Sequence, residues 1–419
     1  MKKLGLKNLE ELHTITLYAF AFSLPLYQKL ATILLVLLVI TSLFRLNNKI
    51  VADDLWPYWI PIMLYVFIGV SLFSAEAIEL KYMENRASFV ALPLIFLTLK
   101  ITKDIFEGVI KFFIIGCVVA VSACYANAIY NSFNWVDEAL VFQPVVSGNF
   151  SFFYAVVRDG NYFFSDFFSM FHDTIYFSIY LNTAIAAILS FQLHKKNKWY
   201  ILAIFLYSLT IFQLSSKIGI ITCFIIFAVY LFLRLKTVTQ RVLAPLFIVL
   251  IGILFLQQNP RGKAMIEKFK TEGLSIDANE RFGYTLRLMS WDASLELIKN
   301  KPLTGVGVAD AQRALNKKYK EKEYTTPLKQ NLNSHNSFIQ IFLECGIIGF
   351  ILLSMMLYYL YKGLSKLKAR TQRFNTLFIL VILMVFLFES VLNRFSGIAF
   401  FMFFYCLLIN LKKHVEIRG

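Results

Sequence analysis

Residues 337–360 read SFIQIFLECGIIGFILLSMMLYYL, and Glu344 is the one charged residue among them. A helix needs about 20 mostly apolar residues to cross the hydrocarbon core of a bilayer. This stretch therefore predicts a membrane-spanning helix. Similar stretches recur through the chain and predict about twelve spans, with bounds near 11–27, 29–45, 56–73, 83–99, 108–129, 171–192, 199–213, 217–233, 242–257, 337–360, 375–391 and 395–411.

The composition agrees with a chain that lies mostly in a membrane. Of its 419 residues, 58% are hydrophobic and only 16% are charged, whereas about a quarter of the residues in a typical soluble domain are charged. This balance excludes a soluble enzyme, a disordered protein and a fibrous protein. Because the apolar stretches are too long for barrel strands, we predict an all-α polytopic membrane protein.

The distribution of positive charge predicts the orientation of these helices. The net charge of +16 would suit a nucleic-acid partner, but most Lys and Arg residues between the spans lie in short connections on one side. Such clusters mark the cytoplasmic side of a membrane. The bilayer is therefore the expected partner, no nucleic acid is expected, and both termini are cytoplasmic.

Two long segments on the opposite side divide the chain. The resulting parts are N-terminal transmembrane helices (1–129), a first outer segment (130–170), central transmembrane helices (171–257), a large outer loop (258–336), and C-terminal transmembrane helices with a cytoplasmic tail (337–419). The first outer segment is rich in Phe and Tyr, which predicts that it lies along the membrane interface. The large loop is mildly basic, and its pattern predicts a helix that ends before Pro302 and a second helix over 309–320.

No metal or cofactor is expected. The five cysteines lack the spacing of a disulfide framework or a zinc site, and buried thiols explain them. The histidines are scattered, and no P-loop, GxSxG or GxGxxG pattern occurs. The sequence therefore argues against an ATPase, a lipase and a nucleotide-binding enzyme, and it leaves a metal-independent glycosyl transfer open.

Basic residues supply the first candidates for a site, because a charge within a membrane is costly. Lys217 lies in QLSSKIGI, between two apolar stretches. Its ammonium either reaches the outer surface or faces an anionic substrate in a cavity. Arg281 and Arg287 belong to the large loop, where they are either solvated charges or partners for phosphate, which a guanidinium binds through two parallel hydrogen bonds.

His335 lies in a polar cluster, NSHNS, at the point where the large loop enters the tenth predicted span. Helix capping explains Ser334 or Asn336, but it does not explain the histidine. Imidazole is the usual side chain for proton transfer near neutral pH, so His335 is a candidate for that role.

Two further pairs are weaker candidates. His172 and Tyr176, in FHDTIYFSIY, are four positions apart, which places them on one face of a helix. They form either an anchor at the membrane interface or part of a site. Glu389 and Arg394, in FESVLNRFSG, lie at the outer junction of the last two spans. A structural ion pair explains them as well as a site does.

From the sixth span onwards, the chain resembles the bacterial O-antigen ligase and O-antigen polymerase family. The segments that carry the resemblance are HDTIYFS, LSSKIGI, RLMSWDASLELIKNKPLTGVG, SHNSFIQIFLECGIIGF and FES, in this order. Lys217 stands where the family usually has an arginine, which keeps the charge and loses the bidentate geometry. The first five spans match the family only in hydropathy.

The resemblance implies a transferase in the bacterial inner membrane whose active site faces the periplasm, the side of the two long segments. The donor is a glycan on undecaprenyl diphosphate, and a hydroxyl of the acceptor displaces the lipid diphosphate. His335 and Arg287 are implied as catalytic residues, with Lys217 as a further cation for the diphosphate. The remaining substrate-binding candidates are His172, Tyr176, Asn336, Arg281 and Glu389.

The resemblance favours a ligase that transfers a polysaccharide to lipid A–core, because a long loop ending in His-Asn follows the ninth span. A polymerase that joins lipid-linked repeat units is the first alternative, and a transferase of glycans to protein Ser or Thr is the second. A transporter of lipid-linked sugars is the alternative from another class of protein. Such folds tend to contain internal repeats, and none is evident here.

Overall fold

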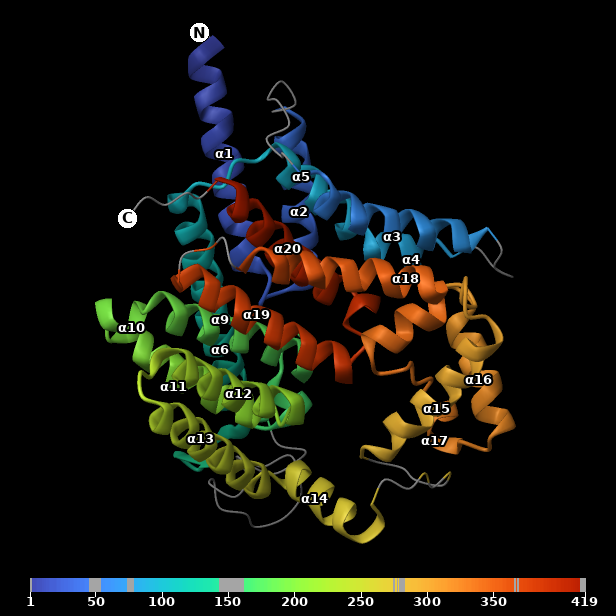
Figure 1. The fold of residues 1–419 in the computed structure, drawn as a ribbon. Coiled ribbons are helices and arrows are strands. Elements are labelled where there is room, and N and C mark those ends of the chain that lie inside the picture. Colours follow the sequence, from blue (N-terminus) through green and yellow to red (C-terminus); the bar gives the residue numbers. More distant parts are fainter. Residues whose placement is uncertain are drawn as a thin grey trace. The chain divides into compact units, whose positions relative to one another are not determined.

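The fold is described from a computed structural model. It describes residues 2–44, 54–73, 79–142, 162–273, 276, 278, 283–364, 367 and 369–414. The chain forms two compact units: unit 1 comprises 1–41, 103–267 and 367–381, and unit 2 comprises 42–102, 268–366 and 382–419. Both units are built from helices (Figure 1).

Unit 1 contains most of the central helices. They are α1 (Lys2–Ser23), α2 (Gln28–Leu43, up to residue 41), α6 (Lys103–Ser132), α8 (Ser165–Phe168), α9 (Thr174–Phe191), α10 (Leu193–Lys196), α11 (Trp199–Gln213), α12 (Lys217–Arg234), α13 (Val238–Gln258), and the first parts of α14 (Pro260–Glu272) and α19 (Ala369–Phe388). Almost every residue of α9 is buried, so α9 is the core of this unit. Helix α12 packs closely on α9, because Gly219 lies against Ser178 and its carbonyl accepts a hydrogen bond from Asn182 Nδ2 at 3.0 Å. Small residues permit such close approach between membrane helices.

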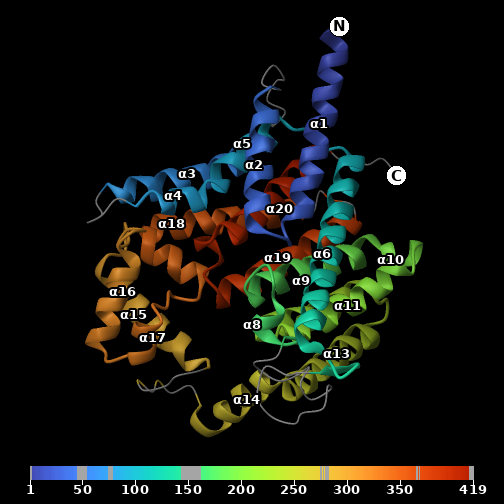
Figure 2. The ribbon, with the colours of Figure 1, turned by 180° about the vertical axis from the view of Figure 1, so that it is seen from behind.

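Unit 2 combines early and late parts of the sequence. Its elements are α3 (Trp56–Leu72), α4 (Lys81–Arg86), α5 (Ser88–Thr98), α15 (Thr285–Asn300), α16 (Ala311–Glu321), α17 (Thr325–Lys329), α18 (Ser337–Lys362), the 3-10 helix η2 (Val391–Asn393), α20 (Phe395–His414) and the end of α19. Asn410 of α20 donates to the carbonyls of Phe96 and Leu99, which lie at the end of α5. In both views, α15, α16 and α17 lie together beside α18 (Figures 1 and 2), and their shared core includes Met289, Leu315 and Leu343.

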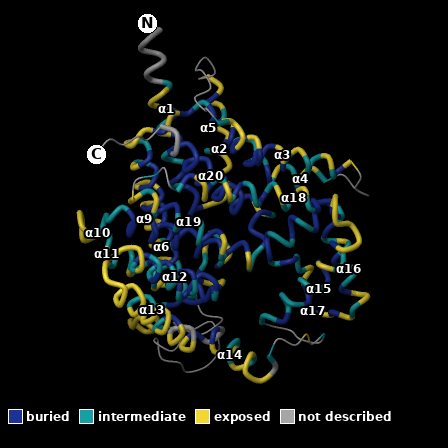
Figure 3. Tube along the Cα trace, in the orientation of Figure 1, coloured by how far each residue is buried: buried dark blue, intermediate teal, exposed yellow. Residues whose placement is uncertain are grey.

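The helices agree with a multi-pass membrane protein. Within the described residues, five helices are both long and apolar enough to cross a membrane: α6, α9, α12, α18 and α19. Shorter apolar helices occur at 28–43, 56–72, 199–213, 238–254 and 395–411. Much of helix α13 is exposed (Figure 3). Its exposed residues include Leu246, Phe247 and Leu250, as expected where a helix faces lipid. The total of twelve spans stays a prediction.

Several predicted elements differ in detail. The span predicted at 83–99 is divided between α4 and α5 at Ala87. The outer segment 130–170 contains a short antiparallel hairpin, β1 (Phe133–Val136) and β2 (Ala139–Phe142), which was not predicted. Asp137 and Glu138 form its turn with positive φ angles of 47° and 64°, a conformation in which Asn-Gly is the usual signal. Residues 143–161 of that segment lie outside the described residues.

The predicted helix 337–360 is interrupted at Gly346. This glycine has φ 61° and ψ −160° within α18, and a Cβ atom there would lie 2.2 Å from the carbonyl oxygen of Leu303. The turn 302–307 fills the interruption: Val306 N donates to Leu343 O at 2.8 Å and Gly307 N donates to Glu344 O at 3.1 Å. In return, Ile347 N donates to Pro302 O at 2.9 Å. The turn thus satisfies backbone groups of the interrupted helix, as an apolar environment requires.

Candidate functional site

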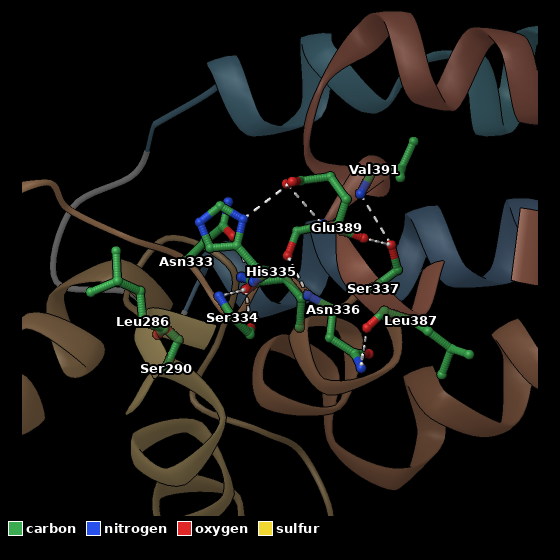
Figure 4. A network of polar contacts seen from close by, with 12 residues as sticks. Leu286, Ser290, Asn333, Ser334, His335, Asn336, Ser337, Leu387, Glu389 and Val391 are labelled. Atoms are coloured by element: carbon green, nitrogen blue, oxygen red, sulfur yellow. Dashed lines mark hydrogen bonds and ion pairs between the residues drawn. The ribbon is translucent and has the colours of Figure 1, made fainter. Parts of the chain in front are cut away.

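His335 lies in unit 2, in the connection between α17 and α18. Its backbone has φ 44°, which is unusual for a residue other than glycine. Such a conformation costs about 1–3 kcal/mol and persists only where the surroundings hold it. Here His335 N donates to Asn333 Oδ1 at 2.8 Å, and the preceding Ser334 N donates to Gln340 Oε1 at 3.0 Å. The polar cluster around His335 is therefore built around one strained residue (Figure 4).

Asn336 is the N-cap of α18. Its Oδ1 accepts hydrogen bonds from Phe338 N at 2.9 Å and Ile339 N at 3.1 Å, and its Nδ2 donates to Leu387 O at 3.0 Å. These contacts give Asn336 the capping role that the sequence left open. They also tie the start of α18 to the end of α19, and the predicted contact of Asn336 with substrate stays a prediction.

Glu389 directly follows α19 and faces the imidazole of His335 (Figure 4). Its Oε2 lies 3.2 Å from His335 Nδ1, and its Oε1 accepts from Ser390 N at 3.1 Å. The side chains of His335 and Glu389 are 25% and 13% exposed, so the pair remains partly open to its surroundings. Within the described residues, Nε2 of His335 makes no hydrogen bond, and it is the ring nitrogen left for another partner.

Ser337 holds the backbone at Glu389 in place through two hydrogen bonds. Its Oγ donates to Glu389 O at 2.7 Å and accepts from Val391 N at 3.0 Å (Figure 4). The first residue of α18 and the segment after α19 are thereby held together. Because His335 precedes Ser337 by only two positions, these bonds also limit the distance between His335 and Glu389.

Arg287 of α15 contributes positive charge to this region. Burial lowers its pKa, and the charge of Glu389 opposes that shift. Its Nε is buried and has no hydrogen-bond partner among the described residues, and the same holds for Nε1 of Trp291, one helical turn further along α15. These two N–H groups on one side of α15 could therefore donate hydrogen bonds to a bound molecule.

The electrostatic setting keeps Glu389 ionised. Burial alone would raise the pKa of its carboxyl group, but the hydrogen bond from His335 and the electrostatic interactions with His335 and Arg287 outweigh burial. The pKa of Glu389 therefore lies below its ordinary value of 4.5. An ionised carboxylate at Nδ1 favours the tautomer in which Nε2 can accept a proton.

A buried ion pair that was not predicted as part of a site lies next to this cluster. Arg86 Nη2 donates to Glu344 Oε2 at 2.9 Å and to Asn393 Oδ1 at 3.0 Å. The side chains of Arg86 and Glu344 are only 1% and 3% exposed. The sequence does contain a signal for the pair, since each residue places a charge within a predicted span, where ionisable groups are rare.

Comparison with known families identifies the central part of the chain. Residues 202–354 match the model of the family described as O-antigen ligase. Over these residues the chain is similar to the O-antigen ligase family. This confirms the family that the motifs indicated, and it supports an enzyme of the O-antigen ligase and polymerase type that acts on lipid-linked glycans in a membrane. A comparison with curated proteins found no match.

The residues that match the O-antigen ligase family include Lys217, Arg287, His335 and Glu344, whereas Arg86 and Glu389 lie outside the match. Lys217 belongs to unit 1, where it is the first residue of α12 and is partly buried. The preceding residue, Ser216, caps the helix by accepting from Gly219 N at 3.2 Å. The role of Lys217 in substrate binding stays a prediction.

His172 and Tyr176 also belong to unit 1, and they lie outside the residues that match the O-antigen ligase family. His172 precedes α9, so the helical spacing that placed it on one face with Tyr176 does not apply. Instead, its ring meets Tyr180 edge-on, with ring centroids 5.1 Å apart. Burial lowers the pKa of His172 to about 4, which leaves the ring neutral at pH 7.

The remaining predictions concern Arg281, metal ions and the cysteines. Arg281 lies outside the described residues. Within the described ranges, no group of three or more His, Cys, Asp or Glu residues is arranged to hold a metal ion. All five cysteines are free and buried.

Proposed function

We propose that this protein transfers a polysaccharide from undecaprenyl diphosphate to lipid A–core at the periplasmic face of the bacterial inner membrane. The observation that carries this proposal is the pairing of His335 Nδ1 with Glu389 Oε2 at 3.2 Å, which leaves Nε2 open. The family match to residues 202–354 supports the class of reaction. The choice of lipid A–core as acceptor rests on the long loop that ends in His335-Asn336.

In the proposed reaction, a sugar hydroxyl of the acceptor attacks the anomeric carbon of the donor glycan. A new C–O bond forms as the bond between that carbon and the diphosphate oxygen breaks, and the electron pair leaves with the undecaprenyl diphosphate. The hydroxyl proton passes to Nε2 of His335. The carboxylate of Glu389 stabilises the imidazolium that forms, and the proton later returns to solvent.

The leaving diphosphate gains negative charge in the transition state, and fixed cations lower the free energy of that state. Arg287 is proposed for this role because its charge lies close enough to interact with Glu389 and its buried Nε has no partner in the described protein. Lys217 is proposed as a further contact of the donor on the strength of the sequence resemblance alone. On the same basis we propose that the donor glycan or the acceptor substrate contacts His172, Tyr176 and Arg281.

A transfer assay in membrane vesicles tests this proposal. The vesicles would contain the protein and an undecaprenyl-diphosphate glycan, with lipid A–core either present or absent, and mass spectrometry would identify the products. We expect a product that requires lipid A–core and carries the donor glycan once. Vesicles with the His335→Ala variant provide the matched background.

Other outcomes would replace the proposal with one of its rivals. A ladder of lengthened glycans on the lipid carrier, formed without added acceptor, would establish a polymerase that uses the same chemistry. Glycan on a protein Ser or Thr would identify a protein glycosyltransferase. Movement of the lipid-linked glycan between the leaflets without any transfer would identify a transporter.

A further inference from the structure

Arg86 uses a single nitrogen to join two parts of the chain that carry the candidate site. Its Nη2 has two N–H donors, and both are used: one on Glu344 Oε2 at 2.9 Å and one on Asn393 Oδ1 at 3.0 Å. Both acceptors are far away in the sequence, 258 and 307 positions from Arg86. The side chain of Arg86 is 1% exposed, so no substrate reaches it.

The first connection leads from Arg86 to the backbone next to His335. Glu344 Oε1 accepts from Gln340 Nε2 at 2.7 Å. Gln340 Oε1 in turn accepts from both the backbone N and the hydroxyl of Ser334. Ser334 immediately precedes His335, whose positive φ of 44° needs support from its neighbours.

The second connection leads from Arg86 to the segment that carries Glu389. Asn393 ends the short helix η2 and donates its backbone N to Ser390 O at 3.2 Å. Ser390 follows Glu389 directly and donates its N to Glu389 Oε1 at 3.1 Å. The first contact of Arg86 is thus connected to Ser334, which directly precedes His335. The second contact is connected, through Ser390, to Glu389.

We propose that Arg86 is a positioning residue, which sets the geometry of His335 against Glu389 through Glu344 and Asn393. This inference rests on the proposed function and adds to it a residue that touches neither substrate nor the reacting atoms. A buried ion pair is poor evidence for stability, because apolar residues of similar volume often stabilise a fold equally well. The directional hydrogen bonds of Nη2 nevertheless favour one arrangement of Glu344 and Asn393 where apolar packing would allow several, even though Nε of Arg86 is buried without a partner among the described residues.

The double variant Arg86→Met/Glu344→Met tests this role without leaving a buried charge unpaired. Reconstituted into vesicles, it should retain a thermal unfolding midpoint near that of the wild type, measured with a dye that reacts with the buried cysteines as they become exposed. Its kcat should fall by about 100-fold, the effect of a misplacement of about 1 Å. The KM values for donor and acceptor should change by less than about threefold, since substrate contacts remain.

A conservative variant and a control complete the experiment. Arg86→Lys keeps a charge for Glu344, but an ammonium cannot reproduce both hydrogen bonds of Nη2, so kcat should fall by about tenfold, which is less than in the double variant. Tyr405→Phe removes another buried hydrogen bond of unit 2, from Tyr405 Oη to Pro57 O at 2.8 Å, and should leave kcat unchanged.

The outcomes separate this inference from the proposed function. Wild-type vesicles that transfer no glycan would overturn the proposed function itself. If the wild type is active, a folded double variant with wild-type kcat would overturn the positioning role. If the double variant fails to fold, Arg86→Lys decides, and wild-type kcat together with a wild-type unfolding midpoint in that variant would overturn the role as well.

Discussion

Glu389 lies 54 positions after His335 in the sequence, and its Oε2 is nonetheless 3.2 Å from the Nδ1 of that histidine. The two residues follow different elements, since His335 precedes α18 and Glu389 follows α19. Asn336 and Ser337 hold these elements together through bonds to Leu387, Glu389 and Val391. The pairing is thus a product of the way the two helix ends meet.

Replacing His335 with Ala or Gln should lower transfer by at least about 100-fold, because general base catalysis contributes about 10²–10⁴-fold. The vesicle assay measures this effect at matched protein levels. His194→Gln, in the short helix α10 of unit 1, is the control and should transfer normally. Normal transfer by both His335 variants would remove His335 from the mechanism.

Replacing Glu389 with Gln should lower kcat by about 100-fold, since the amide cannot stabilise the imidazolium. It should also change the dependence of stability on pH. The folded pKa of Glu389 lies below its ordinary value of 4.5, so the carboxylate contributes stability above that value, and the contribution is lost as the pH falls through the lower folded pKa.

Thermal unfolding midpoints of the wild type and Glu389→Gln, measured from about pH 7 to about pH 3, test the second part. The wild type should be the more stable protein at the upper end of the range, and the difference should shrink at the acid end. A difference that stays constant, or that grows as the pH falls, would contradict the sign of the shift.

Arg287→Ala should impair use of the donor more than Arg287→Lys. Removal of one fixed charge from a transition state typically costs about 10²–10³-fold in rate, whereas lysine keeps the charge and loses the bidentate geometry. Kinetics at varied donor concentration measure both effects. Equal activity of the wild type and the two variants would remove Arg287 from the mechanism.

Lys217 can be tested by substitution with the residue that the family usually has there. Lys217→Arg should retain or improve use of the donor, because a guanidinium adds a second parallel hydrogen bond to phosphate. Lys217→Gln should raise the KM for the donor by about tenfold, as the loss of one charge-assisted hydrogen bond predicts. Identical KM values in all three proteins would favour an ammonium that only reaches the membrane surface.

Gly346→Ala should destabilise the protein strongly. A Cβ atom at Gly346 adds the strain of φ 61° to a clash with the carbonyl of Leu303 at 2.2 Å. Gly273→Ala is the matched control, because Gly273 has a similar φ of 64° and a Cβ atom there would meet nothing described within 4 Å. The control should cost about 1 kcal/mol and Gly346→Ala at least about 2 kcal/mol more. Equal unfolding midpoints for the two variants would show that the turn 302–307 yields without cost.

The positions of the helices could be predicted from the sequence because the length of an apolar stretch is a local property. The helix α15 ends at Asn300, just before Lys301-Pro302, as the proline predicted. The interruption of α18 at Gly346 could not be predicted in this way, because glycine is common in uninterrupted membrane helices. It depends on a turn that lies about 40 residues earlier in the chain.

The contacts within the candidate site could not be predicted from the sequence either. His335 was singled out as a candidate for proton transfer, whereas Glu389 was named together with Arg394, and the functional roles of His335 and Glu389 stay predictions. Their pairing could not be derived, because it depends on how the ends of α18 and α19 meet. Arg86 was not predicted as part of a site. Its charge within a predicted span was the available signal, but its partners Glu344 and Asn393 are fixed by tertiary structure.

The turn at 302–307 has a consequence for how the protein is made. A ribosome delivers this turn before α18, so we expect α18 to enter the bilayer while the carbonyls of Leu343 and Glu344 still lack donors. Those carbonyls find donors only when Val306 and Gly307 reach them from outside the helix. Biogenesis of this segment is therefore completed by docking of the extramembrane chain, and a deletion within the turn should leave a poorly inserted helix that quality-control proteases remove.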